Sequence, residues 1–348
     1  MNLIKKTYKF ILPTMLTLVL LGFVFVAQKA DALTISPARM ELSGDPGTTI
    51  TKDITLFNDS ITIDQTFYIS YANFEAKGET GAPNFVAPKD DIGTWMKTIS
   101  DIVTIPAGES IVVSVAIDIP EDAYAGGHFG VVFFGTNPND GKAGQVSVGA
   151  KTGSLILLTV SGDVLMAGGV DKLKTYKEEA DNKQIFTSFF KTLPVNFEYR
   201  FKNDGNDRVK PEGNIVVRNL FFIKSADLEA NASYGNILPK STRAFQVKWL
   251  KSPNDNKIET MSFINRVGYE WNNFALGPYK ATLHLIYGAE NTSKTIFFFV
   301  FPWELSLIIL IILLIVYFVG KLLLKKYNSH IIEKARSVYD AQKEVNNG

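Results

Sequence analysis

The sequence contains no cysteine and three histidines, and its 36 Lys and Arg residues nearly balance 35 Asp and Glu residues. The lack of cysteine excludes a disulfide scaffold, a thiolate zinc site and a cysteine nucleophile. The near-neutral charge gives no electrostatic basis for binding nucleic acid. Sequence patterns of zinc proteases, serine hydrolases and phosphate-binding loops are missing as well. We therefore expect a protein that is not an enzyme and that uses no cofactor or metal ion.

Apolar residues make up 46% of the chain, and many of them lie in two runs near its ends. The first run covers residues 10–26, follows a lysine-rich start, and precedes a small-x-small pattern formed by Ala30 and Ala32. This order of parts is typical of a secretory signal peptide. The sequence therefore predicts a signal peptide over residues 1–32, with the mature chain beginning near Leu33. An uncleaved N-terminal membrane helix is the alternative, and the shortness of the run disfavours it.

The second apolar run covers residues 305–319 almost without interruption and extends to residue 324. About twenty apolar residues in a helix match a hydrocarbon core of roughly 30 Å. Because lysine and arginine are concentrated after this run, the C-terminus is expected on the cytoplasmic side and the N-terminal ectodomain outside, extracellular or periplasmic. We predict one transmembrane helix at residues 304–324. The short basic tail, residues 325–348, has the spacing of an amphipathic helix, which would lie on anionic lipid or dock a cytoplasmic partner.

Between the two ends the sequence is mildly acidic and has the pattern of β-strands almost throughout. Short runs rich in Thr, Val, Ile, Phe and Tyr are separated by Gly, Pro, Asn and Asp, and no helical periodicity of useful length is expected there. The expected strands include residues 51–57, 65–71, 110–119, 128–135, 154–161, 195–201, 213–218, 243–249, 280–287 and 295–301. The predicted fold class is an all-β ectodomain of two tandem immunoglobulin-like antiparallel β-sandwiches, followed by a single transmembrane α-helix.

A weak internal repeat divides this region. Asn58-Asp59-Ser60 corresponds to Asn203-Asp204-Gly205, and each is followed by a Pro-containing turn and then by a glycine-rich strand start. We predict a first sandwich at residues 33–163 and a second at residues 164–303. The lysine-rich segment 172–183 is either the first exposed strand of the second sandwich or part of the connection between the sandwiches. We favour the edge strand, because lysines on an edge oppose unwanted pairing.

Few residues in this region are candidates for a binding site. The most unusual composition is Gly126-Gly127-His128, which follows Tyr124; its glycines allow a bulge for packing or, alternatively, close approach of a partner's strand. A satisfied or solvent-facing strand position is expected for His128 rather than a role as base or ligand. Tyr279 in Gly-Pro-Tyr is the candidate for a tyrosine corner, in which the hydroxyl ties a loop to the sheet.

The acidic stretch Asn203-Asp204-Gly205-Asn206-Asp207 is compatible with a hairpin turn or with a calcium loop, since Asp and Asn oxygens suit both. The bidentate glutamate that completes a calcium loop is missing at the required spacing. We therefore expect a turn.

The order of parts and several segments resemble the WxL-interacting proteins of bacterial cell surfaces. The resembling segments are residues 54–60 (ITLFNDS), 105–110 (IPAGES), 119–134 (IPEDAYAGGHFGVVFF), 203–213 (NDGNDRVKPEG) and 276–279 (LGPY). This resemblance implies a signal peptide, a peptidoglycan-binding sandwich, a sandwich that binds WxL proteins or a host, one C-terminal span and a Lys-rich tail. The segment 35–39 (ISPAR) is also similar to the start of periplasmic pilus chaperones, which are soluble.

The sequence thus predicts a non-enzymatic cell-surface protein, anchored in the membrane by one span. Its expected partners are a cell-wall polymer such as peptidoglycan or another surface protein, bound through the tandem sandwiches in an adhesive role. The alternative is a membrane-tethered chaperone or assembly factor that acts on exported clients by β-strand addition at an edge of the first sandwich.

Overall fold

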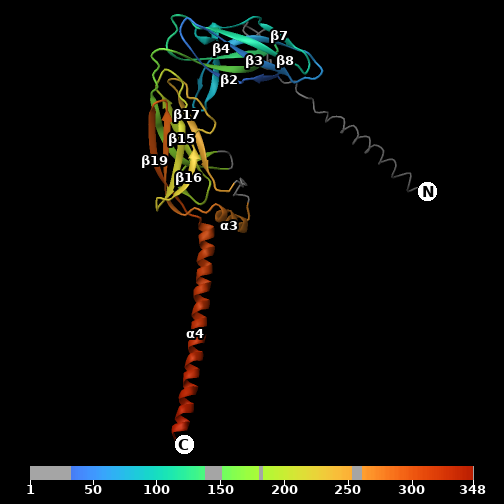
Figure 1. Ribbon diagram of the computed structural model, residues 1–348. Coiled ribbons are helices and arrows are strands. Elements are labelled where there is room, and N and C mark those ends of the chain that lie inside the picture. The colour runs from blue at the N-terminus through green and yellow to red at the C-terminus, as the bar shows by residue number, and fades with distance from the viewer. Residues whose placement is uncertain (1–32, 138–150, 180–182, 253–260, 348) are drawn as a thin grey trace, which may run out of the picture. The chain divides into compact units, whose positions relative to one another are not determined.

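The structure is a computed structural model, and it describes residues 33–137, 151–179, 183–252 and 261–347. The chain forms two compact units, with the main boundary between Ser161 and Gly162. Two short stretches from the earlier part of the chain, Glu75–Asn84 and Ala125–Gly127, group with the second unit. Figure 1 shows the two β-rich units and the single long helix that follows them.

The first unit is a sandwich of two sheets. One sheet has the strand order β1 (Leu33–Ser36), β3 (Thr49–Asn58), β8 (Ser110–Asp118) and β6 (Met96–Thr98). The other has the order β2 (Arg39–Gly44), β10 (Lys151–Val160), β9 (Gly126–Gly135), β4 (Gln65–Lys77) and β5 (Ala82–Val86), and β7 (Ile102–Ile105) also pairs with β4. A one-turn helix, α2 (Ile92–Trp95), precedes β6.

The alternation of side chains explains why the two sheets of the first sandwich pack together. On β3, Ile54 and Leu56 are fully buried, whereas the residues between and beside them are exposed. Val132 and Phe134 of β9 are buried in the same cluster from the opposite sheet. Because successive residues of a strand point to opposite faces, each sheet contributes one apolar face to a shared core.

The second unit is also a sandwich of two sheets. One sheet has the order β12 (Gln184–Phe186), β11 (Gly168–Glu178), β14 (Val195–Asn203) and β17 (Thr242–Trp249). The other has the order β13 (Phe189–Phe190), β19 (Glu290–Val300), β18 (Gly277–Tyr287), β15 (Glu212–Asn219) and β16 (Lys224–Glu229). The predicted fold class, two immunoglobulin-like sandwiches followed by one apolar helix, is therefore confirmed.

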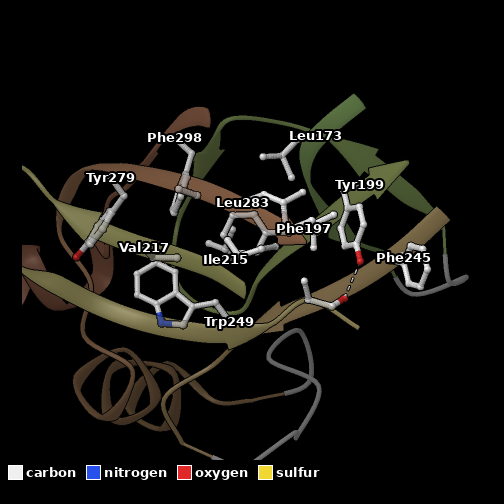
Figure 2. Close-up of a cluster of buried hydrophobic side chains, with 14 of the residues drawn as sticks. Leu173, Phe197, Tyr199, Ile215, Val217, Phe245, Trp249, Tyr279, Leu283 and Phe298 are labelled. Carbon is white, nitrogen blue, oxygen red and sulfur yellow. Dashed lines mark hydrogen bonds between the residues drawn. The ribbon is translucent and has the colours of Figure 1, made fainter. Parts of the chain in front are cut away.

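Aromatic rings fill much of the second core (Figure 2). Trp249 of β17 is buried, and its ring centroid lies 5.1 Å from that of Tyr279 and 6.0 Å from that of Phe298. On the neighbouring strand, the Tyr199 hydroxyl donates a 3.1 Å hydrogen bond to the carbonyl of Ala230. Large rings at edge-to-face angles bury apolar area from both sheets, while the phenol oxygen of Tyr199 keeps a hydrogen-bond partner.

The internal repeat has a structural counterpart in two buried asparagines. Asn58 donates through Nδ2 to the carbonyls of Ile63 (2.9 Å) and Ile105 (3.1 Å), and its Oδ1 accepts from the Ser60 N–H (3.0 Å). Asn203 makes the same kinds of bonds in the second sandwich, to Asp207 O (2.7 Å), Ile237 O (2.9 Å) and Gly205 N (2.9 Å). In each sandwich one amide side chain therefore closes a turn and joins it to a neighbouring segment. The two copies of the repeat therefore share this hydrogen-bonding arrangement as well as their similar sequence segments.

Three features of the fold differ from the sequence expectations. Two strand pairs are parallel, β2 with β10 and β13 with β19, because in each sandwich a segment from the start of the unit joins the last strand. Strand β11 is not the edge of its sheet: the chain turns back after Glu178, and β12 covers β11 at Tyr176, Lys177 and Glu178. A ten-residue helix, α3 (Phe263–Asn272), interrupts the β-pattern between β17 and β18.

The sequence did not predict helix α3, because this helix faces the rest of the protein in an unusual orientation. It buries Tyr269 and Glu270 and exposes Ile264 and Trp271, so the apolar face points outward. An amphipathic helix of a soluble domain normally has the opposite arrangement. Ser262 caps the start of α3, because its hydroxyl accepts the Asn265 N–H at 3.5 Å. A serine at this position was the sequence signal that could have indicated the start of a helix.

The last element is α4 (Trp303–Asn347), a continuous helix that begins three residues after the end of β19. In the part of the chain that the structure describes, one helix is long and apolar enough to cross a membrane, and it is the Trp303–Ser337 part of α4. The basic tail continues this helix without a break. The predicted signal peptide, with its cleavage residues Ala30 and Ala32, lies outside the described residues.

Candidate functional site

His128, the third residue of β9, is fully buried in the first sandwich. Its Nδ1 is paired with the Asp91 carboxylate, and its Nε2 lies 2.9 Å from the backbone carbonyl of Tyr124. Both ring nitrogens of His128 therefore face an oxygen atom. The structure thus joins the buried side chain of His128 to the carboxylate of Asp91, a residue that lies 37 positions earlier.

Asp91 joins several elements at this point. Its Oδ1 accepts the backbone N–H of Ile92 at 2.7 Å, which caps the start of α2, and its Oδ2 accepts the Tyr124 hydroxyl at 3.3 Å. Its φ of 78° is one that residues with a side chain rarely adopt. One carboxylate therefore holds a helix start, a strand start and the loop before that strand.

Two aromatic rings cover the imidazole. The centroid of Tyr124 lies 4.2 Å from that of His128, and the centroid of Trp95 lies 4.6 Å from it. Partial burial of the phenol, together with the negative charge of Asp91, raises the pKa of Tyr124 to about 12. The tyrosine therefore remains neutral over the physiological range and can donate to Asp91.

Asp91, Trp95, Tyr124 and His128 form one cluster, in which His128 is buried and Tyr124 lies at the surface. Both imidazole nitrogens face oxygen atoms of the cluster or its backbone, and both carboxylate oxygens of Asp91 take part in hydrogen bonds. Within the described residues there is no group of three or more His, Cys, Asp or Glu side chains placed to hold a metal ion. Sequence reasoning selected Tyr124 and His128 but missed Asp91 and Trp95, since nothing local links residues 91–95 to β9.

The two glycines before His128 serve a close backbone approach. Gly127 N–H donates to the carbonyl of Asn206 at 2.9 Å, and a Cβ built on Gly126 would lie 2.4 Å from the same oxygen. All three residues belong to the second compact unit. The φ of Gly126, 118°, is also one that side-chain-bearing residues rarely adopt. The backbone that approaches these two glycines therefore belongs to the same chain, at Asn206.

Tyr279 lies on β18 of the second sandwich, far from this cluster in the sequence. Its hydroxyl accepts the backbone N–H of Leu276 at 3.2 Å, and its ring stacks on Phe298 at a centroid distance of 5.6 Å. The phenol thus ties the loop before β18 to the sheet. Burial raises its pKa above the ordinary tyrosine value.

The acidic stretch from Asn203 to Asp207 forms a turn stabilised by its own side chains. Asn203 is fully buried, and its amide bonds the backbone of Gly205 and Asp207. The Asp207 carboxylate accepts the Arg208 N–H at 2.7 Å. These contacts occupy side-chain oxygens of Asn203 and Asp207 that a calcium loop would direct at a cation. His284 of β18 and His330 of α4 are exposed.

Strand β2 forms one edge of its sheet in the first sandwich and is a further candidate for a binding surface. Leu155 N–H donates to Ala38 O (2.9 Å) and Ser161 N–H donates to Gly44 O (3.0 Å), one bond at each end of the β2–β10 pair. Peptide groups alternate in direction along a strand, so those of Arg39 and Ser43 point away from β10. Among the described strands, none pairs with β2 on that side. Sequence reasoning predicted an edge in the first sandwich without identifying which strand forms it.

No family model matches the chain, and no curated protein matches it. Solved structures that it resembles include the class 5 fimbriae chaperone CfaA, with 14% identity, a TM-score of 0.37, and 76% of this chain and 98% of that chain covered. The E. coli chaperone DraB has 9% identity and a TM-score of 0.32, with 76% and 98% covered. The Salmonella enterica SafA pilin in complex with the SafB chaperone has 8% identity and a TM-score of 0.32, with 78% and 99% covered. These values are too low to transfer a ligand to this chain.

Proposed function

We propose that this chain is a non-enzymatic, single-pass membrane protein whose first sandwich binds an extended segment of another cell-surface protein. The observation that carries the proposal is the open edge of β2. The Trp303–Ser337 part of α4 is long and apolar enough to anchor the protein, and the sandwiches would then lie on the outer side of the membrane.

The outward peptide groups of Arg39 and Ser43 on β2 offer what strand addition requires. Unpaired main-chain groups at a sheet edge form a template for a partner's backbone, and side-chain positions beside it select the partner. Arg39 and Glu41 form a 3.5 Å ion pair on this strand, and charges of this kind discourage indiscriminate pairing of edges. The edge therefore suits a specific partner better than general adhesion to unfolded chains.

A proline substitution tests this site with little effect on the fold. Ser43→Pro removes an N–H that points away from β10, so the β2–β10 ladder keeps its hydrogen bonds, whereas Ser43→Ala keeps the N–H and removes only the hydroxyl. The full-length chain, carrying a photo-crosslinker at Arg39, is expressed on living cells. We expect a surface protein to cross-link to the wild type and to Ser43→Ala, and the yield to fall several-fold in Ser43→Pro.

Other results would contradict the proposal. Retention of cell-wall sacculi with no protein cross-link would favour the polymer-binding alternative, which the resemblance to WxL-interacting proteins implies. Equal cross-linking in Ser43→Pro and Ser43→Ala would exclude the β2 edge. Sustained turnover of an envelope substrate by the purified chain would refute a non-enzymatic role. If the chain did not fractionate with membranes, the proposed membrane anchor would be refuted.

A further inference from the structure

Four consecutive large apolar side chains are exposed in the loop between β15 and β16 of the second sandwich. They are Leu220, Phe221, Phe222 and Ile223, and Phe221 and Phe222 are 76% and 74% exposed. The loop is held by its own hydrogen bonds: Asn219 Oδ1 accepts the N–H groups of Phe221 and Ile223, both at 3.0 Å. An ordered loop that presents this much apolar surface indicates a binding surface.

Strand register places this loop at the end of the sandwich from which α4 departs. Asn219, the last residue of β15, pairs with Tyr279 of β18, and Tyr279 pairs with Phe298 of β19. Two residues after Phe298, β19 ends, and α4 begins three residues later at Trp303. Two strand spacings separate β15 from β19, about 10 Å. The loop therefore lies beside the first turn of the apolar helix.

Helix α3 lies at the same end, because it is docked on that first turn (Figure 1). Arg266 Nε contacts the Glu304 carboxylate at 2.9 Å, and the Leu305 N–H donates to Glu270 Oε2 at 2.7 Å. The two contacts come from one face of α3. Polar side chains thus fix this helix against the start of α4 and leave its apolar face free of the sandwich.

The free face of α3 is apolar. Ile264 is 80% exposed and Trp271 is 66% exposed, and Gly268 lies between them on the same face, since positions i, i+4 and i+7 align on a helix. Trp303, at the start of α4, is exposed as well. Aromatic rings with a polar atom are favoured at the boundary between lipid headgroups and acyl chains.

Basic side chains accompany the apolar loop. Arg218 of β15 pairs directly with Lys280 of β18, and like charges placed opposite each other in a sheet repel. The Arg218 guanidinium also donates to the carbonyl of Phe222 at 3.0 Å, which places a positive charge at the base of the loop. Anionic phosphate groups next to this pair would offset the repulsion.

We propose that this end of the second sandwich is seated in the lipid interface of the bilayer that α4 crosses, with residues 220–223 and the Ile264–Trp271 face of α3 inserted among the lipids. The inference rests on the membrane anchoring proposed above. The occupant is lipid because both apolar surfaces flank the first turn of the spanning helix. Insertion of these surfaces would fix the orientation of the second sandwich on the membrane, whereas attachment through a flexible linker would leave its orientation free.

The experiment uses the natural absence of cysteine. Single variants Phe221→Cys and Ile264→Cys of the full chain are labelled with an environment-sensitive fluorophore in vesicles of phosphatidylethanolamine and phosphatidylglycerol. Ala289→Cys is the matched control, because it lies in the turn between β18 and β19 at the opposite end of the same sheet. Leu313→Cys, within the apolar helix, reports on anchoring itself.

We expect nitroxide lipids to quench the labels at positions 221, 264 and 313, and iodide to quench the label at 289 several-fold more strongly than those at 221 and 264. Iodide quenching at 221 and 264 equal to that at 289, with 313 still quenched by lipid, would overturn the seating and leave the anchor intact. Loss of lipid quenching at 313 would refute the anchor. A shielded label at 221 that nitroxide lipid does not quench would indicate a protein partner and contradict the proposal.

A second pair of variants tests whether the two surfaces act together. Removing both rings in Phe221→Ser/Phe222→Ser should make the label at position 264 several-fold more accessible to iodide. Ile286→Ser, an exposed apolar position near the opposite end of β18, should leave that accessibility unchanged. All three side chains are exposed, so the substitutions remove little core packing. Equal effects of the two variants would contradict seating by the loop.

Discussion

Asn203→Ala should destabilise the second sandwich far more than a surface substitution in the same turn. The Asn203 side chain is fully buried and makes three hydrogen bonds to backbone groups, at 2.7, 2.9 and 2.9 Å. A neutral intramolecular hydrogen bond contributes about 1 kcal/mol net, so the loss comes to about 3 kcal/mol. Asp207 O, Ile237 O and Gly205 N would each lose a partner, which makes this figure a lower bound.

Hydrogen exchange measured by mass spectrometry on the full chain in detergent would localise the effect. A loss of about 3 kcal/mol raises the population of the open state by about two orders of magnitude, since 1.4 kcal/mol is tenfold. Peptides from β14 and β17 should therefore exchange about a hundredfold faster in Asn203→Ala, while those from β3 and β8 should not change. The reciprocal variant, Asn58→Ala, should accelerate exchange in the first sandwich and spare the second.

Asn203→Asp provides a sharper test at nearly constant volume. The carboxylate keeps the acceptor for Gly205 N–H but turns an oxygen toward the carbonyls of Asp207 and Ile237, which raises the pKa of the new carboxyl in the folded state. Its destabilisation should therefore grow as pH rises above the unfolded-state pKa, and shrink in acid. Exchange rates that differ from wild type by less than about fivefold in Asn203→Ala, a cost of about 1 kcal/mol, would refute the reasoning.

Three further predictions concern the other buried polar contacts. His128→Ala leaves the Asp91 carboxylate without its hydrogen-bond partner and should cost about 1–3 kcal/mol in the chemical denaturation of the first sandwich. Tyr279→Phe removes one hydrogen bond to Leu276 and should cost about 1 kcal/mol, so a loss above about 3 kcal/mol would show that the ring has also shifted. The folded-state pKa of Tyr124, about 12, exceeds the ordinary value near 10, so the stability it contributes should fall as pH rises from about 10 to 12; ultraviolet titration of wild type and Tyr124→Phe would show the missing transition.

Much of the fold could be predicted from local patterns. The ten expected strands correspond to β3, β4, β8, β9, β10, β14, β15, β17, β18 and β19, with ends that differ by a few residues. Alternating apolar residues bounded by Asn, Asp, Gly and Pro carry this information, because one face of each strand must be buried. The apolar run at residues 305–319 likewise predicted the start of α4.

The sequence pattern was less informative for α3, where polar side chains contact the protein and apolar side chains are exposed. In α3 the residues that anchor the helix, Arg266 and Glu270, are polar, and those that face outward, Ile264 and Trp271, are apolar. A sequence period cannot show which face meets the protein. The position of β11 was mistaken for a related reason, since exposed lysines indicate solvent on one face and do not exclude a neighbouring strand.

The sequence by itself determined the strand-forming segments, the turn-forming Asn58 and Asn203, the apolar helix and the lack of thiol chemistry, because each depends on residues close together in the chain. Only the tertiary structure decided that Asp91 meets His128, that β2 is an open edge, and that residues 220–223 lie beside the start of α4. Each of these depends on strand order and register. These are set by how the two sheets of each sandwich bury their apolar faces together, and local sequence does not encode which distant strands become neighbours.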